Sequence, residues 1–161
     1  MKKILLYLFL ILLSSTLFGQ EQDKHLTFIL FIDDKVATRD VTDGMFLIKD
    51  STGTIRDKIA FVYHVGYLSM SSADYKKIFD SKLEYRIFMK FKYIEFRPDY
   101  SEYNYENEIP MGWMNDEYII FKVFNTSNKE SKNKYFFKKG VKYIIQVKIP
   151  GFSTLLVTRK K

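Results

Sequence analysis

The chain has 161 residues, contains no cysteine and carries a net charge of +7. The lack of cysteine excludes disulfide bonds, thiol catalysis and thiolate metal sites. Charge is spread unevenly: residues 21–120 hold 13 Lys and Arg against 18 Asp and Glu, whereas residues 121–161 hold 11 against a single acid, Glu130. We therefore predict an acidic body with a basic last quarter, whose basic side is a polyanion-binding face, a partner surface or an ordinary solvated face.

Residues 1–20 have the three-part layout of a secretory signal peptide. Lys2 and Lys3 precede an apolar run that begins at Ile4 and stops at Ser14, and Gly19 supplies a small residue for cleavage. A membrane anchor is the alternative, but a spanning helix needs about 20 apolar residues. We predict cleavage after residue 19 or 20 and export to the periplasm, the outer membrane surface or the extracellular space. The mature chain, residues 21–161, is then a single domain and not an integral membrane protein.

Apolar and polar residues alternate with period two along most of the mature chain, which is typical of strands with one buried face. Predicted strands cover residues 25–32, 36–41, 45–50, 54–62, 59–68, 83–96, 117–124, 141–149 and 153–158, where 54–62 and 59–68 are overlapping readings of one region. Residues 59–68 are apolar on both faces, which favours a central strand. Aspartate and glycine punctuate the breaks, as tight turns require. Seven or eight strands in this pattern predict an all-β fold, a single antiparallel β-sandwich, with a small β-barrel as the alternative.

Two further elements complete the pattern before residue 97. A short helix is predicted at residues 73–79, with Ser71 or Ser72 as its cap and Tyr75, Ile78 and Phe79 on one side. In the long strand 83–96 the alternation slips, because Glu95 falls on the apolar face. We predict a bulge or bend near Tyr93.

Residues 97–116, RPDYSEYNYENEIPMGWMND, combine three tyrosines, a tryptophan and five carboxylates. We predict a long connecting loop here, because the stretch fits neither a helix nor a strand and long loops are commonly functional. Tyrosine and tryptophan are enriched at interfaces. The loop is thus either a partner site or a lid in which Tyr103, Tyr105 and Trp113 fold over the core, with residues 110–113 as a plug.

The C-terminal stretch GVKYIIQVKIPGFSTLLVTRKK, residues 140–161, predicts a hairpin that turns at Pro150-Gly151. It resembles the last hairpin of the C-terminal sorting domains used by type IX secretion, in which a Gly-x-Tyr strand precedes a strand ending in lysines. Here Gly140 and Tyr143 are one residue further apart, and the earlier glycine and aspartate turns of those domains are absent. The resemblance implies delivery to the cell surface.

No catalytic or metal-binding constellation emerges from the motifs. DSTGT, residues 50–54, matches the Asp-x-Thr-Gly-Thr signature of phosphoaspartate enzymes, yet its place between two predicted strands favours a hairpin turn. The two histidines, His25 and His64, lie on predicted strands without a partner nucleophile. Four aspartates within residues 33–43 do not follow a calcium-loop spacing. We predict no catalytic residues, no metal site and no cofactor.

The function that fits this pattern is an exported, non-enzymatic β-sandwich that binds a protein partner or an envelope component as an accessory, inhibitor or assembly factor. Export argues against a nucleic-acid ligand. The candidate binding residues are Tyr100, Tyr103, Tyr105, Trp113, Lys138 and Lys139. Two alternatives stay open: a small secreted hydrolase using Glu106 and Glu108 or Asp116, and a structural subunit of an envelope or cell-surface complex.

Overall fold

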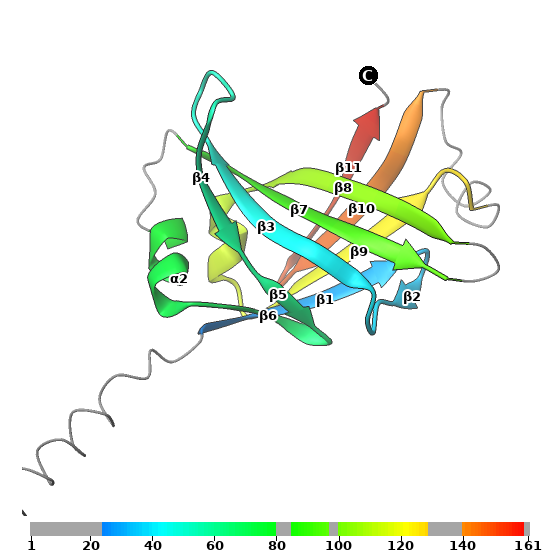
Figure 1. Ribbon diagram of the computed structural model, residues 1–161, viewed down its shortest axis with the longest axis horizontal. Coiled ribbons are helices and arrows are strands. Elements are labelled where there is room, and N and C mark those ends of the chain that lie inside the picture. The colour runs from blue at the N-terminus through cyan, green and yellow to red at the C-terminus, as the bar shows by residue number, and fades with distance from the viewer. Residues whose placement is uncertain (1–23, 80–84, 97–99, 129–139, 160–161) are drawn as a thin grey trace, which may run out of the picture.

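The computed structural model describes residues 24–79, 85–96, 100–128 and 140–159, and shows two β-sheets packed face to face (Figure 1). The predicted signal peptide, residues 1–20, and the candidate residues Lys138 and Lys139 lie outside the described residues and stay predictions.

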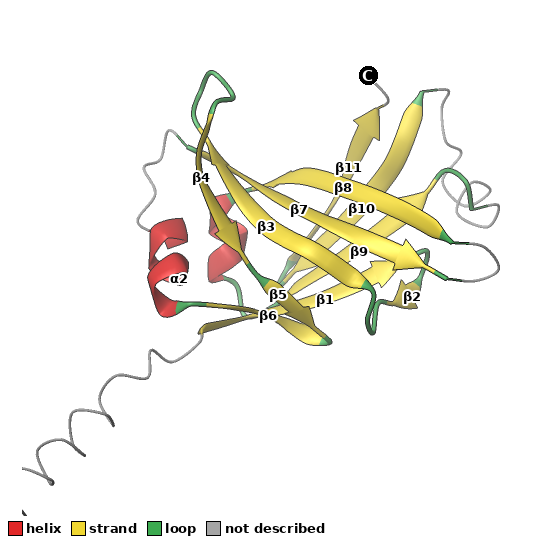
Figure 2. Cartoon of the chain, in the orientation of Figure 1, coloured by secondary structure: helices red, strands yellow, loops and turns green. Residues whose placement is uncertain are grey.

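The larger sheet has seven strands and the smaller sheet four. The larger sheet has the order β11 (Phe152–Arg159), β10 (Val141–Ile149), β9 (Ile119–Asn125), β1 (Lys24–Ile32), β6 (Gly66–Met70), β5 (Val62–His64), with β2 (Lys35–Val36) beside β1. The smaller sheet has the order β4 (Ile55–Ala60), β3 (Val41–Lys49), β7 (Arg86–Glu95), β8 (Ser101–Ile109). Strands dominate the chain (Figure 2), and the two sheets do not close on each other, so the predicted all-β sandwich is confirmed over the small barrel.

One strand pair departs from the predicted antiparallel arrangement. β1 and β9 run parallel, with Phe28 opposite Ile119 and Ile32 opposite Val123. Every other pairing among the described strands is antiparallel. β9 enters the larger sheet from a strand of the smaller sheet rather than through a hairpin, so its direction is set by that crossover.

Two short helices cover the end of the sandwich opposite the β7–β8 connection (Figure 1). The predicted helix is confirmed as α2 (Ser72–Phe79), with Ile78 buried. Ser71 caps it, since its Oγ accepts a hydrogen bond from the amide of Asp74 at 3.1 Å and donates one to Asp74 Oδ2 at 2.9 Å. Within the described ranges, no helix is long and apolar enough to cross a membrane.

The core lies between the sheets and follows the alternation of the strands. Residues 141, 143, 145 and 147 of β10 and residues 119, 121 and 123 of β9 are all buried, as the sequence pattern predicts. At the centre, the rings of Phe28 and Phe121 lie 5.6 Å apart, and Phe91 reaches Phe121 from the smaller sheet at 6.4 Å. The larger sheet and the smaller sheet are therefore joined by aromatic contacts.

Residues 59–68 do not form the predicted central strand. They are divided among the end of β4, the edge strand β5 and the start of β6. The chain changes sheets at Phe61, whose amide donates to the carbonyl of Gly44 at 3.0 Å, and it turns back into β6 at Gly66, with φ +97°. Both faces are apolar because the segment crosses between layers, not because it is central. Likewise, the predicted strand 36–41 is mostly a connection between β2 and β3.

Residues 97–116 are also not the predicted loop. Residues 101–109 form β8, which pairs with β7 from Ile87–Ile109 to Glu95–Ser101, and Met111–Asn115 form the 3₁₀ helix η1. The glutamates and asparagines of β8 do not predict a strand, because both residue types are depleted in strands. They are tolerated because β7 presents cations beside them: Arg86 pairs with Glu108, and Lys92 lies 3.1 Å from Glu102.

The plug expected from residues 110–113 is confirmed in part. Met114 of η1 is buried, and Met111 and Trp113 pack against the core from the end where β8 finishes. Tyr105, in contrast, belongs to the centre of β8 and is 2% exposed. It is part of the core itself and not of a lid.

Candidate functional site

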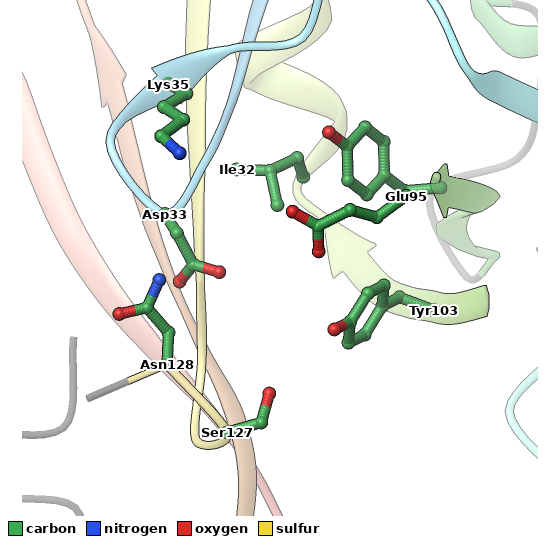
Figure 3. A pocket seen from close by; sticks show the side chains of 8 residues that line it. Ile32, Asp33, Lys35, Glu95, Tyr103, Ser127 and Asn128 are labelled. Carbon is green, nitrogen blue, oxygen red and sulfur yellow. The ribbon is translucent and has the colours of Figure 1, made fainter. Parts of the chain in front are cut away.

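A cavity of about 200 Å³ opens at the end of the sandwich away from the helices. We call it the end cleft. Figure 3 shows its lining side chains, with the carboxylates of Asp33 and Glu95, the hydroxyl of Ser127 and the ring of Tyr103 turned toward one shared space. The lining residues are Ile32, Asp33, Lys35, Tyr93, Glu95, Tyr103, Ser127 and Asn128.

The end cleft exists because the inward faces of β7 and β8 extend beyond the apolar core. On β7 the inward positions Ile87, Met89 and Phe91 are buried, and the same alternation continues to Tyr93 and Glu95. The irregularity predicted near Tyr93 as a bulge or bend is present in the ladder, but on the neighbouring strand rather than on β7. β7 and β8 stay in register to Glu95, and the irregularity lies on the neighbouring strand β3, between residues 42 and 45. Glu95 faces inward because the strand has reached the solvent-filled end of the sandwich.

Three tyrosine rings line up along the smaller sheet from the core to the end cleft. Tyr93 and Tyr103 are directly opposite each other across β7 and β8, with ring centroids 6.4 Å apart. Tyr103 lies 6.4 Å from Tyr105 with an interplanar angle of 5°. The buried ring of Tyr105 thus supports the ring of Tyr103, which faces the cleft.

Hydrogen bonds among Asp33, Asn125 and Tyr105 join the larger sheet to the smaller one behind the cleft. Asp33 accepts two hydrogen bonds from Asn125, one from the amide N–H at 2.8 Å and one from Nδ2 at 2.9 Å. Asn125 Oδ1 in turn accepts a hydrogen bond from the hydroxyl of Tyr105 at 2.8 Å. This chain fixes the β1–β2 turn, the end of β9 and the centre of β8 relative to one another, so the wall of the cleft is preorganised.

A second cavity of about 200 Å³ adjoins the end cleft, because Tyr103 and Ser127 line both. Lys142 and Tyr143 of β10 contribute to it. The hydroxyl of Tyr143 donates to the carbonyl of Glu106 and accepts from its amide, both at 2.9 Å, which joins β10 to β8. The two cavities form a continuous polar and aromatic surface around Tyr103.

The phenols of Tyr93 and Tyr105 stay protonated across the physiological range. Burial, followed by nearby carboxylates of which Glu95 is foremost, raises the pKa of Tyr93. Burial likewise raises the pKa of Tyr105. The cleft therefore offers hydroxyl donors, ring faces and carboxylate acceptors, which suit reversible binding. No described residue that lines either cavity is a histidine.

The structure separates the residues that the sequence grouped as one binding loop. Tyr103 lines both cavities. Tyr100 is 62% exposed and packs on Phe96 at 6.0 Å, but lines neither. Tyr105 lines the second cavity and is otherwise buried, because the inward alternation of β8 takes its ring into the core; its predicted role in contacting a partner stays a prediction. Trp113 lies at the opposite end of β8, 6.2 Å from Phe152.

The carboxylates proposed for a hydrolase are not gathered in a cavity. Glu106 pairs with Lys49 at 2.6 Å, and Glu108 pairs with Arg86, both on the outer face of the smaller sheet. Asp116 ends η1, with its amide bonded to the carbonyl of Trp113 at 3.3 Å. A pair of carboxylates with separated pKa values needs a shared, partly buried setting. Glu106 and Glu108 each have their own cation instead.

The early aspartates and the DSTGT segment have backbone roles. The non-glycine residues with positive φ in the described ranges are Asp33, Asp34, Asp40 and Asp43. Asp33 and Asp34 form the β1–β2 turn, as predicted, and Asp40 directly precedes β3, whereas Asp43 lies within β3 at its irregularity between residues 42 and 45. Residues 50–54 form the turn between β3 and β4, as predicted, with Gly53 at φ +84°. No group of three or more potential metal ligands occurs among the residues described.

Sequence reasoning missed Tyr93, Glu95, Asp33, Ser127 and Asn128 as site residues. The signal that could have found them is the same in each strand: a polar residue stands at an inward position directly after the apolar run ends. Glu95 follows Phe91 and Tyr93 on β7, and Asn125 follows Val123 on β9. Several strands that end this way at one end of a sandwich predict a polar cleft there. Comparison of the chain with protein-family models, with curated proteins and with solved structures finds no match.

Proposed function

We propose that this chain is an exported, non-enzymatic binding module that takes a protein partner or an envelope component into the end cleft. The observation that carries the proposal is that Tyr103 and Glu95 line the same preorganised cavity. Among the contacts found in the described residues, the carboxylate of Glu95 has no hydrogen bond or ion pair, and the hydroxyls of Tyr93 and Tyr103 have no protein partner. Convergent polar groups beside aromatic rings are typical of ligand sites.

Export supports an envelope or extracellular partner and is itself part of the proposal. The precursor is expected to lose about 20 residues on secretion, as a cleavable signal requires. Mass spectrometry of the secreted or periplasmic protein checks this point. A mature protein that still begins at Met1 would remove the envelope component from the proposal.

The cysteine-free sequence allows a direct test of the cleft. Ser127→Cys, at the mouth of the end cleft, and Ser51→Cys, in the β3–β4 turn, each place a single thiol at an exposed position for a photocrosslinker. With the mature protein in envelope extract, crosslinked adducts are expected from the Ser127 probe and not from the Ser51 probe.

Two variants then tie the adduct to the cleft. Tyr103→Ala and Glu95→Gln in the Ser127→Cys background are expected to reduce the adduct yield about tenfold, since few residues dominate binding. Tyr100→Ala, in the same hairpin but outside both cavities, serves as the control. Equal yields from both probe positions, or an adduct indifferent to Tyr103→Ala and Glu95→Gln, would exclude the cleft as the binding site.

A further inference from the structure

Among the described strands, those at the ends of the two sheets, β4, β8, β5 and β11, differ in how well they are protected from pairing with another strand. β4 carries Arg56 and Lys58, β5 has three residues, and β8 carries three glutamates. Charge and shortness are the usual devices that keep an edge from accepting a strand. β11 has neither: it is eight residues long, contains no proline and no charge before Arg159, and keeps a regular register with β10 from residue 152 to residue 158.

β11 also presents apolar side chains on the outer face of the sheet. Leu155 is 53% exposed and Val157 is 54% exposed. In the register with β10, Val157 lies beside Ile144 and Leu155 lies beside Gln146. No described strand pairs with the outer edge of β11, so this edge adjoins exposed apolar side chains that a further strand would cover.

Positively charged residues lie at both ends of this exposed apolar row. Arg159 stands at one end of the outward row of β11, and Lys148 lies beside Ser153 at the other end. Residues 140–159 contain three cations, Lys142, Lys148 and Arg159, and no acidic residue. A second copy of this chain would bring the same cations to the same edge, so like-charge repulsion opposes self-pairing and favours an acidic partner.

We propose that the β11 edge accepts an extended segment of a partner protein as an added strand, and that this segment carries apolar residues flanked by acidic ones. Backbone hydrogen bonds to β11 supply affinity, and alternate side chains packed on Leu155 and Val157 supply specificity. This surface is distinct from the end cleft, because no residue of β11 lines either cavity. Strand addition at β11 can therefore be tested independently of binding in the end cleft.

The outward row 153, 155, 157 and 159 defines a probe. The acetylated and amidated peptide ETVTVTE, laid antiparallel, places its two valines beside Val157 and Leu155 and its two glutamates beside Arg159 and near Lys148. The matched peptide KTVTVTK reverses only the charge, and ETVPVTE removes a central amide donor. Binding of fluorescent peptides to the mature protein is measured by polarisation, and backbone amide shifts by NMR.

The acidic peptide is expected to bind about tenfold more tightly than the lysine peptide, with the preference falling as salt is raised. The proline peptide is expected to lose binding, and amide shifts are expected to concentrate on residues 152–159. Equal binding of the acidic and lysine peptides, or shifts centred on the end cleft, would overturn the inference.

Variants locate the site on the protein. Val157→Glu removes an apolar contact and sets a negative charge against the glutamates of the acidic peptide, so it is expected to weaken that peptide about tenfold. Val62→Glu is the control, because Val62 is 60% exposed on the opposite edge of the same sheet. Thermal unfolding checks that both variants fold. Undiminished binding by Val157→Glu would overturn the proposal, as would a dimer of the unaltered protein in sedimentation that Val157→Lys dissociates.

Discussion

Tyr105 shows how a single hydroxyl joins the two sheets. The centroid of its ring lies 5.1 Å from that of Phe91 in the core. Its hydroxyl donates a hydrogen bond to Oδ1 of Asn125, and Nδ2 of the same asparagine donates one to Asp33. A tyrosine in a polar-looking segment is commonly read as a surface contact. In this protein the residue's position on β8, not its neighbours in the sequence, determines what it does.

The hydroxyl of Tyr105 is expected to stabilise the fold. Tyr105→Phe leaves the Oδ1 atom of Asn125 without its donor in a buried position, which costs about 1–3 kcal/mol of unfolding free energy. Tyr100→Phe is the matched control, because Tyr100 is 62% exposed, and its expected effect is within about 0.5 kcal/mol. Urea unfolding of both variants provides the measurement. Equal stabilities of the two variants would contradict a structural role for the Tyr105–Asn125 bond.

Asp50 gives the protein an acid-sensitive turn. The hydroxyl of Thr52 donates to its carboxylate at 2.6 Å, the amides of Thr52 and Thr54 and the guanidinium of Arg56 add to this, and the pKa of Asp50 is lowered from 3.8 to about 2. A carboxyl whose pKa falls on folding contributes stability above its unfolded value. That contribution is lost as the pH falls through the folded value.

Asp50→Asn is therefore expected to destabilise the protein at pH 7, while the difference from the unaltered protein shrinks as the pH drops from about 4 to about 2. Thermal unfolding midpoints of both proteins across this window check the prediction. Asp57, an exposed neighbour on β4, offers the control substitution Asp57→Asn, whose effect is expected to be small at every pH. A constant difference between Asp50→Asn and the unaltered protein would show that the charge of Asp50 is not responsible.

At the scale of elements, β3 and β5 touch where the chain passes from one sheet to the other. A methyl group on Gly44 would lie 2.5 Å from Cε2 of Phe61 and 2.8 Å from its carbonyl oxygen. The ring could turn aside, but the carbonyl is held by the backbone, since the amide of Phe61 is bonded to Gly44. Glycine at this position lets the two sheets approach closely.

Gly44→Ala is expected to destabilise the protein by about 1–3 kcal/mol through this overpacking. Gly112→Ala is the control, because an added methyl at Gly112 meets nothing within 4 Å and its backbone lies outside the left-handed region. Unfolding midpoints in urea compare the two. If Gly44→Ala matches the stability of Gly112→Ala, the contact between β3 and β5 does not constrain the fold.

The β7–β8 pair illustrates what pattern reading recovers in an element and what it misses. The alternation of β7 is plain, since its apolar inward face contrasts with Arg86, Lys90 and Lys92 outside. β8 has the same alternation, but its outward residues are glutamate and asparagine, and its inward ones include two tyrosines, a serine and an asparagine. The acidic residues of β8 are explained by the cations of β7 that lie beside them. The sequence does not show this, because it does not say which strands pair.

For the molecule as a whole, one core is expected to unfold as one unit. Trp113 is the single tryptophan, lies in η1 and packs on Phe152 of β11, so its fluorescence reports the contact between the end of the smaller sheet and the edge of the larger one. Its urea transition is expected to coincide with that of far-UV circular dichroism, which follows all strands. Separate midpoints would show that the two sheets lose structure independently.

Replacing Phe28 tests how much the central contact between the sheets contributes to the free energy of unfolding. Phe28 is fully buried and packs on Phe121, so Phe28→Ala is expected to cost about 3–5 kcal/mol, a large share of the roughly 5–15 kcal/mol typical of a domain. Phe152→Ala is the control, since Phe152 is 52% exposed. Chemical unfolding of the two variants is expected to separate them clearly. Equal losses of unfolding free energy in Phe28→Ala and Phe152→Ala would contradict a central role for Phe28 in the core.

The sequence by itself determined the all-β class, the helix at residues 72–79, the turn at 50–54 and the C-terminal hairpin, because each depends on contacts between near neighbours: alternation, caps and turn residues. Only the tertiary structure decided the parallel pairing of β1 with β9, the identity of β8 and the end cleft. These depend on which strands meet, and residues as distant as Asp33 and Asn125 become partners only when the sheets pack. Glu95 lay on the apolar face in the sequence pattern, and the fold shows that this position opens into the end cleft.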